Sequence, residues 1–272
     1  MAVAGTWYPA EPRGLADSVD ALIADAAPAA ERPLAVIAPH AGYVYSGAVA
    51  AAAMSGLRGA ASEPVVLLGP SHHVGFSGAV VPRATSYRTP LGDVPIDRRV
   101  AELAGHPGFR ADDRPFAPEH SLESELPFLQ RLLEPGWSIV PVLIGGGGAA
   151  GERRRVAEAL RPLWESGAPF VVSSDFTHYG EGFGYVPFRD DVPERIERLD
   201  RGAIELIELG DEDGFRDYVE RTGATICGRH SIEVLLHLAG GEVRGRTAAY
   251  DTSGRMTGDW GHSVSYAGVV MA

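Results

Sequence analysis

The chain has 272 residues, of which 45% are hydrophobic, and its formal net charge is −12 at pH 7. This length and composition predict one large domain with a full core, and the acidic excess argues against a nucleic-acid or anionic-membrane partner. All 24 basic residues are arginines, which excludes chemistry that needs a lysine, such as a Schiff base or a pyridoxal-phosphate anchor.

The amino-terminal segment does not resemble a secretory signal, because MAVAGTWYPAEPRG has no basic start followed by an apolar run. No stretch approaches the roughly 20 apolar residues that a membrane-spanning helix needs. The single cysteine, Cys227, cannot form an intrachain disulfide. We therefore expect a cytoplasmic protein that does not enter a membrane.

Short apolar segments of strand length alternate with helical patterns along the chain. The expected strands are residues 34–40, 65–72, 138–145, 170–178 and 264–271. Apolar residues at helical spacing predict helices around 15–23, between Leu122 and Leu133, and over 193–210, the last ended by Gly210. Such strands indicate a covered sheet, so we expect a single α/β domain over residues 1–272 with a central, mostly parallel or mixed sheet.

Polar side chains of the types that bind metals or transfer protons follow three of these strands. They are His40, the pair His72 and His73, and the pair Asp175 and His178. Ligands of open α/β sheets bind at the carboxyl ends of the strands. The sequence therefore predicts that these side chains converge on one cleft.

Two histidines and one anionic ligand form a set that suits zinc, iron or copper and leaves coordination positions open. Two residues compete for the anionic place. Cys227 precedes an apolar helical pattern, and a helix amino terminus favours the thiolate over the thiol. Asp175 is the alternative ligand. Both residues also have a structural interpretation. Cys227 is then a buried inert thiol, and Asp175 is a carboxylate that caps a turn.

Nine short motifs stand in one order along nearly the whole chain. They are AGTWYP (4–9), IAPHAGYVYSG (37–47), LGPSHH (68–73), YRTPLGD (87–93), EHSLE (119–123), PVLIG (141–145), VVSSDFTHYG (171–180), ICGRHS (226–231) and SVSYAG (263–268). Together they resemble the Memo family, whose fold is similar to that of the class III extradiol dioxygenases. The resemblance implies a metal held by His40, His72 and Cys227, in a pocket that Asp175 and His178 also line.

Five further residues are predicted to surround these ligands or to contact a substrate: His73, Tyr43, Arg229, His230 and Glu123. We expect His73 to orient His72 or to bind the backbone. Arg229 is expected either to hold a substrate carboxylate or to pair with a structural carboxylate. Tyr43 is expected in the core or the cleft wall, and Glu123 beside the site or at the surface.

The resemblance implies a metal-dependent oxidoreductase that acts on a small organic substrate with O2. Fe(II) is the favoured metal, with copper and zinc as alternatives, because Cys227 stands where the dioxygenases have a carboxylate. In this interpretation His178 is the general acid and base, tuned by Asp175. The alternatives are a non-catalytic metal- or peptide-binding protein and a zinc-dependent hydrolase. The resemblance also implies a radical-SAM protein and an AMMECR-type protein as partners.

Overall fold

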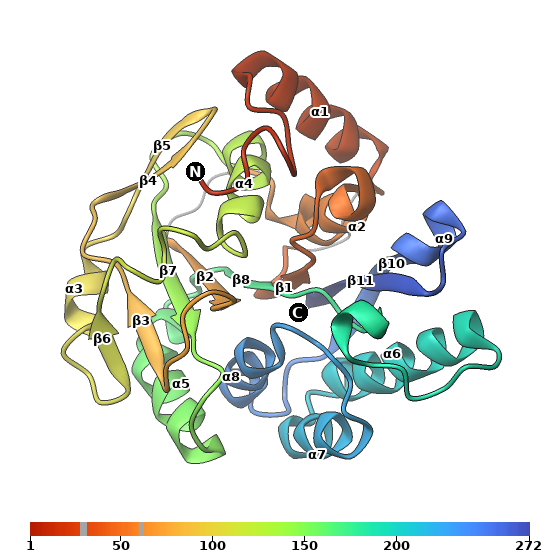
Figure 1. The fold of residues 1–272 in the computed structure, drawn as a ribbon. Helices are drawn as coiled ribbons and strands as arrows, with labels where there is room; N and C mark the ends of the chain where they lie inside the picture. The colour runs from red at the N-terminus through yellow and green to blue at the C-terminus, as the bar shows by residue number, and fades with distance from the viewer. Residues whose placement is uncertain (28–31, 60–62) are drawn as a thin grey trace.

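A mixed β-sheet crosses the middle of the molecule, with helices on both faces (Figure 1). The structure is a computed structural model and describes residues 1–27, 32–59 and 63–272. In this part of the chain the sheet has nine strands, in the order β10-β11-β1-β8-β2-β7-β3-β6, with β9 paired to β11. The strands are β1 (Ala35–Ala38), β2 (Val65–Pro70), β3 (Ala79–Val81), β6 (Phe109–Ala111), β7 (Ile139–Ile144), β8 (Phe170–Ser173), β9 (His178–Gly180), β10 (Gly245–Thr252) and β11 (His262–Met271). A separate hairpin consists of β4 (Ser86–Thr89) and β5 (Gly92–Pro95).

The helices form one layer on each face of the sheet. They are α1 (Pro12–Asp25), α2 (Tyr43–Met54), α3 (Arg99–Leu103), α4 (Leu126–Leu132), α5 (Ala150–Glu165), α6 (Val192–Glu208), α7 (Glu212–Thr222), α8 (Arg229–Ala239) and α9 (Ser253–Thr257). Helices α1, α2 and α4 pack on one face, and α5, α6, α7 and α8 on the other (Figure 1). Among the described residues, none of these helices is long and apolar enough to cross a membrane.

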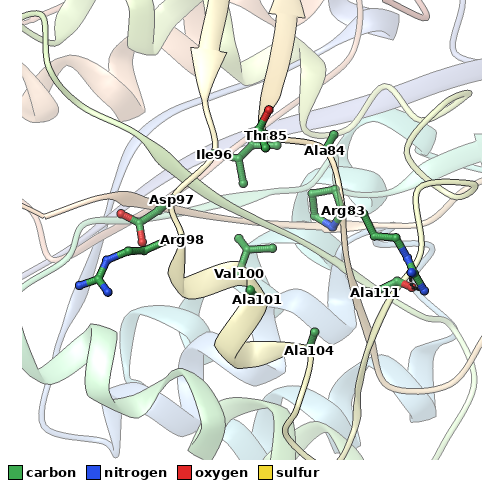
Figure 2. Close-up of a pocket in the computed structure, with 11 residues that line it drawn as sticks. Arg83, Ala84, Thr85, Ile96, Asp97, Arg98, Val100, Ala101, Ala104 and Ala111 are labelled. Carbon is green, nitrogen blue, oxygen red and sulfur yellow. Dashed lines mark hydrogen bonds between the residues drawn. The ribbon is translucent and has the colours of Figure 1, made fainter.

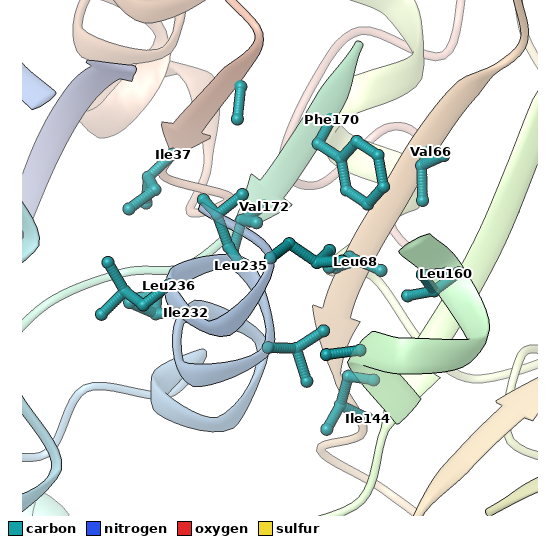
Figure 3. Packing of buried hydrophobic residues seen from close by; sticks show 14 of the residues in the cluster. Ile37, Val66, Leu68, Ile144, Leu160, Phe170, Val172, Ile232, Leu235 and Leu236 are labelled. Atoms are coloured by element: carbon teal, nitrogen blue, oxygen red, sulfur yellow. The ribbon is translucent and has the colours of Figure 1, made fainter. Parts of the chain in front are cut away.

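The four central strands, β1, β8, β2 and β7, run parallel and are buried along their whole length. Alternate side chains point to opposite layers, as strand geometry requires. Ile37, Leu68 and Val172 pack in the cluster beneath α5 and α8 (Figure 3), whereas Leu67 and Val171 pack with α1, α2 and α4. Strands β11 and β3 join this core in the antiparallel sense, so the sheet is mixed. The predicted single α/β architecture with a covered sheet is confirmed.

Most element boundaries differ from the prediction by only one or two residues, and two segments differ in kind. Residues 170–178 are not one strand, because β8 ends at Ser173 and His178 begins β9. The intervening residues turn inward and bond to other segments; the Asp175 amide, for instance, donates to the Cys227 sulfur at 3.2 Å. The helix expected from Leu122 begins instead as a short 3-10 turn over Glu123–Glu125 and continues as α4.

Candidate metal centre

Three side chains from distant parts of the sequence meet at the carboxyl ends of the central strands. His40 follows β1, His72 follows β2 and Cys227 lies two residues before α8. Their candidate ligand atoms all lie within 4.8 Å of one another, and the Cys227 Sγ is 3.4 Å from the His40 Nε2. We call these residues the ligand triad. Two imidazoles and one sulfur at this spacing form a donor set that fits a transition metal.

The His40 ring is held in one orientation. Its Nδ1 is 2.8 Å from the Ser173 Oγ, and its backbone amide donates to the Asp175 Oδ1 at 2.9 Å. This leaves Nε2 directed toward Cys227. Only 2% of the residue is exposed, and burial, followed by the nearby His72 and His120, lowers the pKa of His40 well below its usual value. His40 is therefore a neutral imidazole, the form that binds metals.

The His72 ring is held by Glu119, a residue that sequence reasoning did not single out. The Glu119 Oε1 is 2.8 Å from the His72 Nδ1, and its Oε2 accepts from the His72 amide at 2.6 Å. Although burial opposes ionisation, the hydrogen bonds and charge of His72 lower the pKa of Glu119 to about 2. A carboxylate on Nδ1 leaves Nε2 available to a metal. Glu119, rather than the predicted His73, is the residue that orients His72.

A second group, His72, Glu119 and His120, also has ligand atoms within 4.8 Å of one another. Its carboxylate is already used, because the Glu119 Oε1 additionally accepts the amides of His120 and Ser121, each at 3.0 Å. The His120 ring stacks on His72 with centroids 4.5 Å apart. Burial lowers the pKa of His120 to about 4, so it is a neutral ring that packs against the triad. We therefore favour the triad as the ligand set.

Cys227 differs from expectation in its protonation state. Burial, followed by the negative charge of Asp175, raises the pKa of the Cys227 thiol. In the metal-free protein, burial therefore opposes the predicted preference for a thiolate. A metal ion must therefore displace the thiol proton when it binds.

Asp175 and His178 lie beside the triad. Asp175 is 4% exposed, and its Oδ2 is 3.9 Å from the His40 Nε2. The His178 Nδ1 is 2.9 Å from the Phe176 carbonyl oxygen and 3.0 Å from that of Thr225. Because both neighbours only accept, Nδ1 carries the proton and the His178 Nε2 keeps a free lone pair. Burial raises the pKa of Asp175, and the nearby His178 partly opposes this rise.

Comparison with known proteins tests the family that the motifs suggested. A family profile described as Memo-like protein matches residues 1–270. The chain is 36% identical over 245 residues to Protein memo-1 homolog of Caenorhabditis elegans, covering 87% of this chain and 69% of that one. It is 34% identical over 242 residues to Protein MEMO1 of Homo sapiens, covering 86% and 82%. The chain belongs to the Memo family.

Among solved structures, this Memo-family chain is similar to uncharacterized protein JW3007 from Escherichia coli K12. The TM-score is 0.47 at 14% sequence identity, over 76% of this chain and 85% of that chain.

Two of the other predicted residues are structural supports in this Memo-family chain. The Tyr43 hydroxyl donates to the Ser124 carbonyl at 2.7 Å, and the ring is buried in the core. Glu123 is 2% exposed and accepts from the Ala2 amide at 2.6 Å and the Tyr8 hydroxyl at 2.6 Å. It anchors the amino-terminal segment and lies neither at the surface nor among the triad.

The remaining predicted residues lie at the surface or along another cavity. His73 is exposed, with its ring centroid 5.8 Å from that of His120. Arg229 and His230 line a polar cavity together with Arg153 and Glu233. Both residues follow Cys227 closely in the sequence, but none of the triad lines their cavity.

Figure 2 shows a different cavity, of about 360 Å³, at the edge of the sheet. Ile96 and Val100 form part of its apolar lining, and Arg83 and Arg98 lie on opposite sides. None of the predicted site residues lines it. It is therefore separate from the candidate metal centre of this Memo-family chain.

A buried acid, Glu125, lies behind the triad. Ser173 has one hydroxyl proton, and its Oγ is 2.6 Å from the Ser121 carbonyl, 2.8 Å from the His40 Nδ1 and 2.8 Å from the Glu125 Oε1. All three contacts are hydrogen bonds if Ser173 donates its proton to the Ser121 carbonyl and accepts from two donors. These donors are the His40 Nδ1 and a protonated Glu125. Among the residues that the structure describes, the other Glu125 oxygen is buried without a partner, which an ionised carboxylate would not tolerate. Burial accordingly raises the pKa of Glu125 well above its usual value.

Glu125→Gln is expected to stabilise the protein increasingly as the pH rises. The folded protein keeps the Glu125 proton, whereas the unfolded chain releases it above the usual glutamate pKa. Wild-type stability should therefore fall by about 1.4 kcal/mol per pH unit in that window. Glutamine has no such proton to lose. Urea unfolding of both proteins between about pH 5 and about pH 7 measures the difference. Glu134→Gln, at an exposed glutamate, is the control; a difference that does not vary with pH would show that Glu125 is ionised.

Proposed function

We propose that this Memo-family protein is a non-haem metal-dependent oxidoreductase that acts on a small organic substrate with O2, in the manner of the class III dioxygenases. The observation that carries the proposal is the ligand triad, in which each histidine presents Nε2 because its Nδ1 is held by Ser173 or Glu119. Fe(II) is the proposed metal, with copper and zinc as competitors for a site that contains sulfur. A radical-SAM protein and an AMMECR-type protein remain the proposed partners.

In this proposal the protein supplies ligands, orientation and proton transfer. A bound transition metal contributes redox chemistry and Lewis acidity at its open coordination positions. His178 accepts a substrate proton at Nε2, because its Nδ1 proton is committed to backbone carbonyls. Asp175 has its Oδ1 fixed by the His40 amide and its Oδ2 beside the His40 ring.

Metal binding is expected to release about one proton per metal ion near pH 8, where histidines are largely neutral. The proton comes from Cys227, whose thiol burial keeps protonated in the metal-free protein. Calorimetric titration in buffers of different ionisation enthalpy measures the released proton. Cys227→Ser should abolish the release and the thiolate-to-metal charge-transfer absorption with Cu(II). Binding of the metal by wild type without either signal would remove Cys227 from the ligand set.

The activity itself is tested by metal content and oxygen uptake. Protein reconstituted anaerobically with Fe(II) should consume O2 in the presence of its substrate, and a panel of phenolic and indolic compounds is the first screen. Reconstitution with zinc should give no oxygen uptake. Substrate turnover with zinc alone would instead favour the hydrolase, and an inability to bind any metal would favour a binding protein.

A further inference from the structure

A polar cavity of about 360 Å³ lies where α5, α7 and α8 meet. These helices are neighbours on one face of the sheet (Figure 1). Its side-chain lining includes three arginines and a histidine, Arg153, Arg216, Arg229 and His230, which we call the arginine cavity. Two carboxylates, those of Glu220 and Glu233, also line it, so its three guanidinium groups leave one excess positive charge in a chain whose net charge is −12.

Two side chains of the arginine cavity, Arg216 and Arg229, keep hydrogen-bond donors that are not used within the described residues. Both oxygens of the buried Glu233 are used, Oε2 by the Arg153 Nε at 2.6 Å and Oε1 by the His230 Nδ1 at 3.2 Å. The Arg216 Nη2 binds Asp213 at 2.7 Å and lies 3.7 Å from Asp217. Its buried Nη1 lies 3.7 Å from the Glu212 Oε1 and makes no hydrogen bond within the described residues. Within the described residues, Arg229 makes no side-chain hydrogen bond or ion pair. Buried donors without acceptors are costly, so this lining suits a ligand that only accepts.

The backbone adds to this preference. Helix α8 begins at Arg229 and has eleven residues, and the sixteen-residue α5 begins three residues before Arg153. The positive ends of both helix dipoles therefore lie at the cavity. The position of Arg153 is fixed by Glu233 and by the Gly148 carbonyl, which its Nη1 contacts at 3.0 Å. Arg229 is left free to form a bidentate contact with a planar or tetrahedral oxyanion.

We propose that the arginine cavity binds the oxyanion group, carboxylate or phosphate, of a small ligand through Arg229, Arg216 and His230. Arg229 follows Cys227 by two residues, so their Cα atoms are at most about 7 Å apart. The wall of the cavity at Arg229 therefore lies near the Cys227 backbone, although no triad residue lines the cavity. A further step, which rests on the proposed function, is that the substrate of the metal centre carries this anionic group.

The test uses the full-length protein after metal removal, so that its outcome does not depend on the metal centre. Inorganic phosphate and acetate are titrated separately by calorimetry at constant chloride concentration. We expect saturable binding of at least one of them at one site per chain. Binding of phosphate alone points to a phosphorylated ligand, and binding of acetate to a carboxylate.

Arg229→Gln should weaken this binding by about tenfold or more, because it removes a charge-assisted pair of hydrogen bonds. It should leave folding intact, since Arg229 has no partner in the described chain to lose. Arg13→Gln, at an exposed arginine of α1 whose carboxylate neighbour is 3.9 Å away, is the matched control and should bind like wild type. Absence of saturable binding by both probes would overturn the proposal, as would equal losses in Arg229→Gln and Arg13→Gln. Failure of metal loading with intact anion binding would reject the proposed function and leave the arginine cavity standing.

Discussion

His72→Ala and His40→Ala should each abolish stoichiometric Fe(II) binding. The triad supplies only three protein ligands, so the loss of one removes a large share of the binding free energy. The affinity should fall by more than about 100-fold, beyond the effect of losing an outer hydrogen-bond partner. Elemental analysis and anaerobic Fe(II) titration of the purified variants provide the measurement.

The two variants differ in how cleanly they report on the metal. His72 has a side chain that is 28% exposed, so its removal leaves the core intact. His40 is buried, and its loss leaves Ser173 without one partner, so urea unfolding must accompany the titration. His106→Ala, at an exposed loop histidine, should bind metal like wild type. Stoichiometric Fe(II) in both triad variants would mean that the metal lies elsewhere.

His178→Gln is expected to lower turnover by about 10²- to 10⁴-fold while leaving the metal content unchanged. Glutamine can still donate to the Phe176 and Thr225 carbonyls that hold the His178 ring. Glutamine has no basic ring nitrogen that could accept a proton, whereas His178 has a free Nε2. Oxygen consumption with an active compound from the phenolic and indolic panel measures the rate.

A nearby histidine provides the control for this substitution. His262 is exposed and stacks on Phe183, whose ring also contacts His178. His262→Gln should therefore perturb the same pocket wall without removing the acid and base. Loss of metal in His178→Gln would make His178 a ligand, and an unchanged rate would assign proton transfer to another group.

The sequence predicted the parts of the fold that depend on strong local patterns. The strands β1, β2, β7 and β8 are continuous apolar runs because both faces are covered. Strands β3 and β6 have three residues each, and β10 lies at the sheet edge with partly exposed side chains. Such segments have no clear period, so tertiary pairing decides their structure.

The candidate site was predictable where a metal-binding type of side chain comes directly after a strand. His40 and His72 stand two residues past β1 and β2 and could be found from that pattern. Glu119 could not, because it lies 47 residues from His72 and reaches it only through the folded chain. The protonation states of Cys227 and Glu125 were equally out of reach. They depend on burial, which the sequence does not specify at single polar positions.

The separation of the triad along the chain has a consequence for the order of assembly. His40 and Cys227 are 187 residues apart, and they meet only after β1, β8 and α8 have packed. Closing so long a loop is slow and costly before long-range contacts form. An ion therefore cannot template the early steps of folding, as it does in small zinc domains. Under the proposed function, metal acquisition would be the last step of maturation, carried out on a finished scaffold, and the cell's metal supply at that moment would select the bound ion.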